Sequence, residues 1–387
     1  MREGFIARLR RAAAVLCCAV MAVFQSAAQA ESGECVETSA RSAIVIEKET
    51  GRVLLHANCH EKLPMASTTK VMTALLALEK GKLDEVVTVG RNAYGVPGTS
   101  IYLSLGEKIT LRDLLYGLML ASGNDAAVAI AEHIGGDVES FCRMMNERAA
   151  ELGCTDTCFL TPHGLPASGH YTTAYDLALI ASEAMKHELF REMVSTKRAS
   201  IPWEGRSYSR ILHNKNKLLS TYEGATSIKT GYTRAAGRCL VFGAKRDGLE
   251  VIGVVLNCGN WFEEAARLMN LTYEKYQSFT ALDAGEMVRV LPVSNGTQET
   301  VVITAGAKLS APVPKDSVPV LEFDLPDEIE AGAEKGENVG RVSLLMNGEV
   351  LSSVPLVVSE TLAVRDYAFE LERLISNWPV QVQSMAE

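Results

Sequence analysis

The alternation of apolar and polar residues in the early part of the chain predicts a β-hairpin. Residues 42–47 and 52–57 alternate in this way, and Glu49-Thr50-Gly51 between them supplies the turn. Residues 71–78 place apolar side chains at the i, i+3, i+4 and i+7 positions, which predicts a helix directly after Ser67. The same helical period recurs over residues 111–120, which a capping box at Thr110 and Asp113 opens, and over 125–134, 138–152 and 174–187.

A second group of patterns predicts two more strands and one more helix. Residues 238–245 and 249–257 are apolar and rich in β-branched residues, and Asp247-Gly248 between them is a strong signal for a tight hairpin turn. A helical period follows over residues 262–277. Since strands come before and after the group of helices, we expect a mixed α/β (α+β) domain with an antiparallel sheet over residues 31–279.

The composition changes after this domain. Residues 286–358 are rich in Val and Pro and lack a helical period. Asn295-Gly296 and Asn347-Gly348 each lie between apolar alternations, which predicts two further hairpins. We therefore expect a small all-β domain over residues 286–358, joined to the first domain through residues 280–285.

The first 30 residues have the pattern of an export signal. Four arginines up to Arg11 precede an apolar run over residues 12–24, and Ala28-Gln29-Ala30 supplies a small-x-small cleavage site. The apolar run is shorter than the roughly 20 residues that a membrane-spanning helix needs. We expect the chain to be exported and residues 1–30 to be removed as a signal peptide, rather than to remain as a membrane anchor.

Composition and charge exclude two classes of protein. A hydrophobic content of 47% over 387 residues excludes a disordered chain. The formal net charge is −9, and without residues 1–30 the chain has 34 basic and 46 acidic residues, a net charge of −12. A surface of this sign repels the phosphate groups of nucleic acids, so we expect no nucleic-acid partner.

Seven cysteines remain after residue 30, and an odd number leaves at least one thiol without an intramolecular disulfide partner. Cys154 with Cys158, and Cys35 with Cys59, are the first pairs to test, because each pair is close in sequence or flanks the first predicted hairpin. The alternative is that most of these cysteines are small buried hydrophobic residues.

A metal site is the bolder of two interpretations for the end of the first hairpin. The spacing of His56, Cys59 and His60 permits two or three metal ligands. We expect these residues to be loop residues instead, and the His-Glu-x-x-His pattern of zinc peptidases does not occur in the sequence. We therefore expect no metal ion to be bound there.

Residues 359–378 predict an amphipathic helix. Apolar side chains from Val364 to Trp378 recur at helical spacing until Pro379 ends the pattern. Acidic residues outnumber basic ones in this segment, which weakens attraction to anionic lipid, whereas Tyr367 and Trp378 suit a membrane interface. Two interpretations stay open: a peripheral membrane anchor, and a helix packed against the β domain.

The first candidate for chemistry is Ser67-Thr68-Thr69-Lys70, at the start of the first predicted helix. Residues three apart share a helix face, so the Ser67 hydroxyl and the Lys70 amine can meet. The helix start also supplies free N–H groups and a positive dipole end, which favour the anionic intermediate of acyl transfer. A serine hydroxyl needs an adjacent base, and Lys70 can be that base only if burial or a second cation lowers its pKa. Lys229 is the candidate for that cation.

Two further stretches complete a recognisable set. Ser122-Gly123-Asn124 lies between two predicted helices, and Lys229-Thr230-Gly231 precedes the Asp-Gly hairpin. Each stretch is common by chance, but all three in this order and in these settings are far more specific. The set resembles the penicillin-recognising serine acyltransferases, and within them the low-molecular-weight D-alanyl-D-alanine carboxypeptidases. Residues 162–166, 170–176 and 236–240 are also similar to that family, and the resemblance covers the whole mature chain.

The resemblance implies a fold, a reaction and a set of residue roles. The fold is the antiparallel sheet of serine β-lactamases and DD-peptidases, flanked by helices with an all-helical subdomain and followed by a small β domain. The reaction is removal of the terminal D-alanine from peptidoglycan stem peptides outside the cytoplasmic membrane, with β-lactams acylating the same serine. The implied roles are Ser67 as nucleophile, Lys70 as base, Ser122 as proton relay, Asn124, Lys229, Thr230 and Gly231 as substrate-binding residues, and the backbone N–H groups of Ser67 and Tyr232 as oxyanion hole.

Two other functions share part of this evidence. A class A β-lactamase has the same three motifs, but it needs a Glu-x-x-x-Asn stretch that is absent between Asn124 and Lys229. The extra β domain also disfavours a β-lactamase. A catalytically silent cell-wall-binding protein would use the β domain, but the presence of all three motifs disfavours it.

Overall fold

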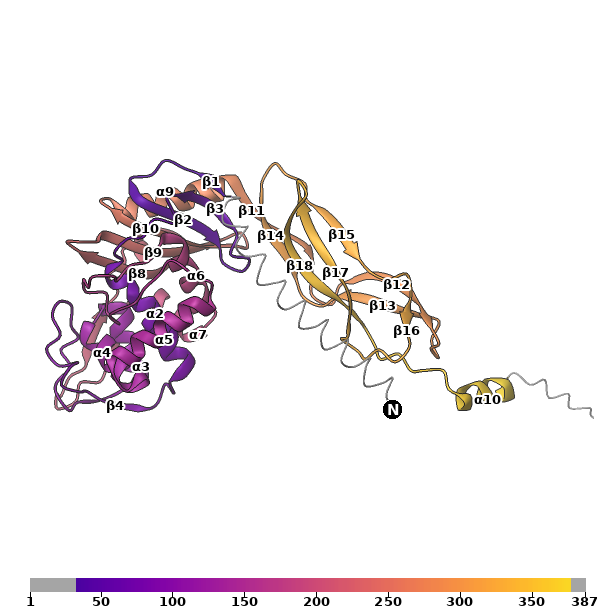
Figure 1. The fold of residues 1–387 in the computed structure, drawn as a ribbon, viewed down its shortest axis with the longest axis horizontal. Helices are drawn as coiled ribbons and strands as arrows, with labels where there is room; N and C mark the ends of the chain where they lie inside the picture. The colour runs from indigo at the N-terminus through magenta and orange to yellow at the C-terminus, as the bar shows by residue number, and fades with distance from the viewer. Residues whose placement is uncertain (1–32, 377–387) are drawn as a thin grey trace, which may run out of the picture. The chain divides into compact units, whose positions relative to one another are not determined.

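The computed structural model describes residues 33–376, whose contacts divide into two compact units (Figure 1). The first unit extends to Lys275 and the second begins at Tyr276. The predicted signal peptide, residues 1–30, and the last two residues of the predicted C-terminal helix lie outside the described residues.

The first unit contains a six-stranded sheet with helices around it, which confirms the predicted fold class. Neighbouring strands are antiparallel, except that β1 pairs parallel with β3. The two predicted hairpins are present, and the turn residues Asp247 and Gly248 have φ angles of 48° and 82°. These left-handed angles are the ones that a type I′ turn needs. In sheet order the strands are β1 (Glu34–Cys35), β3 (Val53–Ala57), β2 (Ala40–Glu47), β10 (Leu249–Cys258), β9 (Gly237–Arg246) and β8 (Ala225–Thr233).

Helices cover both faces of this sheet (Figure 1). Helix α9 packs against β9 and β10, and α6 packs against β10 and β2. Strand β10 is buried along almost its whole length, as a strand covered on both faces must be. Helix α2 is buried from Lys70 to Ala77 and contacts α4, α5 and α6. The helices are α2 (Lys70–Lys80), α3 (Leu111–Tyr116), α4 (Asn124–Gly135), α5 (Val138–Glu151), α6 (Ala174–Ala184), α7 (Glu188–Ser195), α8 (Leu218–Thr221) and α9 (Trp261–Lys275).

The helix predicted over residues 111–120 is divided in the structure. Thr110 caps α3 as predicted, and its Oγ1 accepts a hydrogen bond of 3.1 Å from the N–H of Asp113. The backbone then continues as a π-helical turn, Gly117–Ala121. Two small sheets, which the sequence patterns did not predict, lie beside this region: β4 (Val86–Thr88) with β5 (Lys108–Thr110), and β6 (Arg198–Ile201) with β7 (Arg210–His213).

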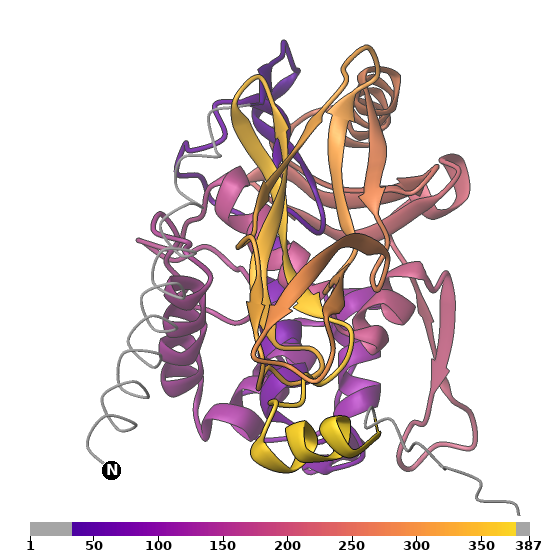
Figure 2. The same ribbon diagram turned by 90° about the vertical axis from the view of Figure 1, so that its right-hand side faces the viewer.

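The second unit is the predicted all-β region (Figures 1 and 2). Asn347 and Gly348 form the predicted two-residue turn, with φ angles of 52° and 82°. Asn295 instead begins a five-residue connection, because Thr297 donates to the carbonyl of Ala363 and so joins this loop to the C-terminal segment. The strands are β11 (Tyr276–Leu282) with β14 (Leu309–Pro314), and, in sheet order, β15 (Val320–Asp324), β17 (Asn338–Met346), β18 (Glu349–Val358), β13 (Thr300–Ala305), β12 (Met287–Ser294) and β16 (Ile329–Glu330).

The predicted junction at residues 280–285 lies inside the second unit, since β11 already pairs with β14 there. Helix α10 (Tyr367–Ser376) forms the described part of the predicted C-terminal helix, and none of these ten residues is buried. Between residues 33 and 376, no helix combines the length and the apolar character that a bilayer crossing requires.

The seven cysteines within residues 33–376 are all free thiols, so neither candidate disulfide is formed. Five of them are buried, as the alternative interpretation expected: Cys59, Cys142, Cys154, Cys239 and Cys258.

Candidate active site

Ser67 lies in a short 3₁₀ turn, Ala66–Thr69, that leads into α2. The predicted position at the start of an α-helix therefore needs a small correction, because Lys70 is the first residue of α2. Ala66 has a φ of +50°, a left-handed conformation that is rare for a residue with a side chain. Such local strain persists only where the surroundings hold it, and it is concentrated at functional sites.

The amine of Lys70 faces the hydroxyl of Ser67. Its Nζ lies 2.9 Å from Ser67 Oγ, 2.7 Å from Asn124 Oδ1 and 2.8 Å from the carbonyl oxygen of His163. The two carbonyl-type oxygens can only accept hydrogen bonds. A neutral amine has two N–H groups and one lone pair, so both donors are used and the lone pair is left for the Ser67 hydroxyl.

The environment of Lys70 favours this neutral form. The side chain is fully buried, and its burial is the main cause that holds the Lys70 pKa well below the ordinary value. The positive charges of Lys229 and Lys215 lower the pKa further, while the Asp125 carboxylate acts in the opposite direction. The environment of Lys70 thus favours a neutral amine beside the Ser67 hydroxyl.

Lys229 extends from β8 toward the second motif. Its Nζ donates to Ser122 Oγ over 2.9 Å and to the carbonyl of Thr230 over 3.1 Å. Burial, with the charge of Lys215 as a smaller cause, lowers the pKa of Lys229 to about 7. Ser122 has a φ of +63° at the end of the π-helical turn, and Asn124 begins α4. Both polar side chains of this motif are buried.

The strand β8 is the edge strand of the six-stranded sheet and lies against the Ser67 turn. A Cβ atom on Gly231 would lie 3.0 Å from the Ser67 nitrogen and 3.1 Å from the Met65 oxygen. Glycine at this position therefore allows the strand to approach Ser67 closely. Thr230 is buried, whereas the side chain of Tyr232 is 64% exposed. The three motifs that the sequence identified thus converge. Lys70 of the first motif is hydrogen-bonded to Asn124 of the second, and Lys229 of the third motif is hydrogen-bonded to Ser122 of the second.

Three contributors to the site lie outside the three motifs. The carbonyl of His163 binds Lys70, and burial lowers the pKa of the His163 imidazole to about 4, so the ring is neutral near pH 7. His170 holds the first motif, because its Nε2 is 2.9 Å from Thr69 Oγ1. Lys215 acts on both site lysines through its charge. Only the resemblance of residues 162–166 and 170–176 to a known family could have indicated the two histidines.

The residues around Cys59 do not form a metal site in the structure. His56 Nε2 is 3.1 Å from the carbonyl of Gly33, and the ring of His60 packs against Tyr175 at 5.0 Å. Within residues 33–376, no group of three or more His, Cys, Asp or Glu side chains is arranged to hold a metal ion.

Comparisons with known proteins give the family. Residues 25–260 match the family model "Peptidase_S11: D-alanyl-D-alanine carboxypeptidase", and residues 276–363 match "Penicillin-binding protein 5, C-terminal domain". A relative from Bacillus subtilis, D-alanyl-D-alanine carboxypeptidase DacF, is 35% identical over 350 residues, which are 88% of this chain and 90% of that protein. D-alanyl-D-alanine carboxypeptidase DacC of Escherichia coli is 32% identical over 84% of this chain and 85% of its own length.

Solved structures agree with this result. Penicillin-binding protein 5 from Haemophilus influenzae has a TM-score of 0.72 and 27% identity, over 85% of this chain and 98% of its own. A serine-to-alanine mutant of the Streptomyces K15 DD-transpeptidase has a TM-score of 0.59 and 35% identity, over 62% of this chain and 99% of its own. The chain therefore belongs to the peptidase S11 family, the serine-type D-alanyl-D-alanine carboxypeptidases that act on peptidoglycan stem peptides.

Proposed function

We propose that the chain removes the terminal D-alanine through an acyl-enzyme on Ser67, with Lys70 as the base. The observation that supports this most directly is the fully buried Lys70 amine, 2.9 Å from Ser67 Oγ, with its two N–H groups directed at other oxygens. A base must be neutral to accept a proton, and the lowered pKa of Lys70 meets that requirement.

In the acylation step, Ser67 Oγ forms a bond to the carbonyl carbon between the two D-alanines, and its proton passes to Lys70. The backbone N–H groups of Ser67 and Tyr232 stabilise the resulting oxyanion. When the C–N bond breaks, Ser122 relays a proton to the leaving amine. The proton that Lys70 took from Ser67 passes through Ser122 to this amine, so Lys70 is neutral again, and Lys229 Nζ, 2.9 Å from Ser122 Oγ, holds the relay hydroxyl in place.

Substrate binding and the second half-reaction use the same groups. Lys229 and Thr230 bind the terminal carboxylate, which the close approach of β8 at Gly231 brings next to Ser67, and Asn124 holds the substrate backbone and the Lys70 amine. Water then attacks the acyl-enzyme and gives a proton to the neutral Lys70, which passes it to Ser67 Oγ as the acyl bond breaks and the shortened peptide leaves. Each step returns the proton that it takes, and neither a metal nor an organic cofactor is required.

Penicillin labelling tests this assignment. Membership of the family implies β-lactam binding, and we propose that the β-lactam carbonyl acylates Ser67. We expect a fluorescent penicillin to give stable labelling on the peptide that contains Ser67, and a D-Ala-D-Ala-terminated peptide to release D-alanine. Rapid turnover of the penicillin without D-alanine release would instead indicate a β-lactamase, and an absence of labelling would contradict the assigned roles.

Replacing Gly231 with alanine should slow acylation strongly. The added Cβ would meet the Ser67 nitrogen at 3.0 Å and so displace β8 from the nucleophile and the proposed oxyanion hole. Loss of one oxyanion donor costs about 100- to 1,000-fold in rate, and we expect a loss of that order in the penicillin acylation rate. Gly259→Ala is the matched control, because a Cβ there has no atom within 4 Å. Equal acylation rates for the two variants would show that the close approach is not needed.

We further propose that the protein works outside the cytoplasmic membrane and that α10 attaches it to that membrane. The export pattern of residues 1–30 supports the first part. For the second part, the exposed apolar residues of α10 recur at positions that share one helix face: Tyr367, Leu371, Leu374 and Ile375.

A truncation separates membrane binding from catalysis. Removal of residues 366–387 keeps the buried Leu362 and the hydrogen bond from the Arg365 N–H to the Asn295 carbonyl. We expect the mature protein to sediment with phosphatidylcholine–phosphatidylglycerol vesicles and the truncated protein to stay in the supernatant. Penicillin labelling should be the same for both. Unchanged sedimentation would exclude α10 as the anchor.

A further inference from the structure

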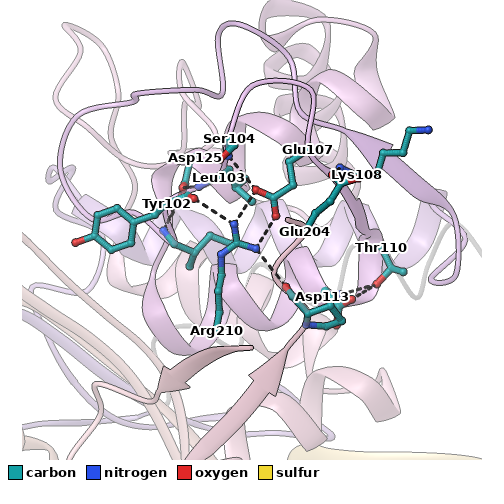
Figure 3. Close-up of polar contacts among 12 residues, drawn as sticks. Tyr102, Leu103, Ser104, Glu107, Lys108, Thr110, Asp113, Asp125, Glu204 and Arg210 are labelled. Carbon is teal, nitrogen blue, oxygen red and sulfur yellow. Dashed lines mark hydrogen bonds and ion pairs between the residues drawn. The ribbon is translucent and has the colours of Figure 1, made fainter. Parts of the chain in front are cut away.

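The segment from Pro97 to Glu107 lies beside the second motif and contains neither helix nor strand. Buried side chains hold it instead (Figure 3). Asp125 accepts hydrogen bonds of 3.1 Å from the N–H groups of Ile101 and Leu103. The Tyr102 N–H donates to Ser100 Oγ over 2.7 Å, and the Ser104 N–H donates to Glu107 over 2.9 Å. Four consecutive N–H groups therefore depend on side-chain oxygens in place of a backbone ladder.

The same segment fixes the amide of Asn124. The Asn124 N–H donates to the Thr99 carbonyl and its Nδ2 donates to the Pro97 carbonyl, each over 2.7 Å. The Thr99 contact fixes the backbone of Asn124, and the Pro97 contact holds the nitrogen side of its side-chain amide, so Oδ1 is directed at Lys70 Nζ, 2.7 Å away. The position of the segment thus determines the position of Asn124 Oδ1. This atom is one of the two oxygens that accept hydrogen bonds from the Lys70 N–H groups.

A buried ion pair joins this segment to the β6–β7 hairpin. The guanidinium of Arg210 binds both carboxylate oxygens of Glu107, at 2.6 and 2.7 Å, and the two side chains are only 3% and 2% exposed. Arg210 also donates to the carbonyl of Tyr102 over 3.1 Å and stacks on the ring of Trp203, 4.5 Å from its centroid. Figure 3 shows Arg210 between Glu107 and the Tyr102 backbone.

Stability alone explains this arrangement poorly. Replacing a buried ion pair by apolar residues of similar size is often neutral or stabilising. Within the described part of the chain, Arg210 Nε has no hydrogen-bond partner, which adds an uncompensated buried donor. The pair also holds Tyr102 at a φ of +60°, and this residue is 74% exposed. A strained backbone that is held by polar contacts next to a catalytic motif indicates a positioning role.

We propose that Glu107 and Arg210 form a positioning pair for acylation, which locks the Pro97–Glu107 segment so that Asn124 holds the Lys70 amine toward Ser67. Neither residue touches the reacting atoms, and both act through Asn124. The inference rests on the proposed roles of Ser67 and Lys70.

The test compares penicillin acylation rates of folded protein at a temperature well below each melting temperature. Glu107→Leu with Arg210→Met removes both charges together, so no single charge is left buried. We expect this double variant to be acylated about 10- to 100-fold more slowly than the wild type, the cost of a small misplacement of a catalytic group. Arg210→Lys keeps the charge but loses the bidentate contact with Glu107, and we expect an acylation rate between those of the wild type and the double variant. It also serves if the double variant does not fold.

The matched control is Arg148→Met. Arg148 binds Glu79 through Nε and Nη2 at 2.8 to 3.1 Å and joins α5 to the far end of α2. We expect this variant to melt at a lower temperature and to be acylated at the wild-type rate. A loss of rate there as large as in the Glu107–Arg210 variants would show that this partly buried ion pair matters equally, and would overturn the proposal.

Asn124→Ala identifies the route of the effect. If the pair acts through Asn124, then adding Glu107→Leu and Arg210→Met to Asn124→Ala should change the rate by less than about twofold. A full additional loss in the Asn124→Ala background, or a wild-type rate for the folded double variant, would overturn the proposal. Failure of the proposed residue roles is distinguishable, because the wild-type protein itself would then not be labelled at Ser67.

Discussion

The variant Ser67→Ala should lose all penicillin labelling and all release of D-alanine while keeping its fold. Removing Oγ takes away the atom that we propose forms the acyl-enzyme bond, so no slower version of the same route remains. Lys70 keeps its hydrogen bonds to Asn124 and to the His163 carbonyl, so the local structure retains its main polar contacts. We therefore expect an unchanged melting temperature within about 2 °C, since surface-accessible changes of this kind have small effects on stability.

Ser168→Ala is the control for Ser67→Ala. Ser168 is an exposed serine on the loop that lies next to the Ser67 turn, so it reports labelling that is unrelated to the site. The control should label like the wild type. Labelling of Ser67→Ala at the wild-type level would mean that another residue is the nucleophile, and unfolding of Ser67→Ala would mean that the serine is structural.

Replacing Lys70 with methionine should slow acylation about 100- to 10,000-fold, the usual contribution of a positioned base. Methionine keeps much of the volume in a fully buried site but has no amine to accept the proton. The control is Lys48→Met, which removes a lysine at the β2–β3 turn that pairs with Glu49 and Glu250. This variant should be acylated at the wild-type rate. An acylation rate for Lys70→Met within a few fold of the wild type would exclude Lys70 as the base.

The pH dependence of the same rate gives an independent check on Lys70. Only the neutral amine accepts a proton, so the wild-type acylation rate should rise with pH as Lys70 loses its charge. Burial and the charges of Lys229 and Lys215 lower the Lys70 pKa, so this rise should occur well below the 10.5 of an ordinary lysine. The residual rate of Lys70→Met should lack the rise.

The local patterns of the sequence predicted most of the fold. The Asp247-Gly248 turn, the Thr110 cap and the helical periods of α2 and α4 depend on residues close together in the chain, and all are present. The β6–β7 hairpin was not predicted. Its strands are four residues long, its connection of eight residues contains no two-residue turn signal, and Arg210 anchors it through the distant Glu107. A contact between residues 103 positions apart leaves no periodic trace in either segment.

The candidate site shows the same division. The three motifs could be found because a helix start, an interhelical loop and a strand next to a hairpin are local features, and the structure brings them within hydrogen-bond distance. The carbonyl of His163 could not be found from residue types, because every residue has a carbonyl. Lys215 acts through space on Lys70 and Lys229, and a lysine in the sequence does not reveal which charges it will face. The catalytic roles themselves stay predictions until the variants above are measured.

The burial of Lys229 has a thermodynamic consequence for ligand binding. With a pKa of about 7, the Lys229 amine is protonated in only part of the ligand-free protein molecules at neutral pH. An anionic ligand that reaches the amine stabilises the ammonium form, so complex formation must draw hydrogen ions from the solvent. The heat of association would then include the ionisation enthalpy of whichever buffer surrounds the protein, and affinity for carboxylates would weaken progressively in alkaline solution.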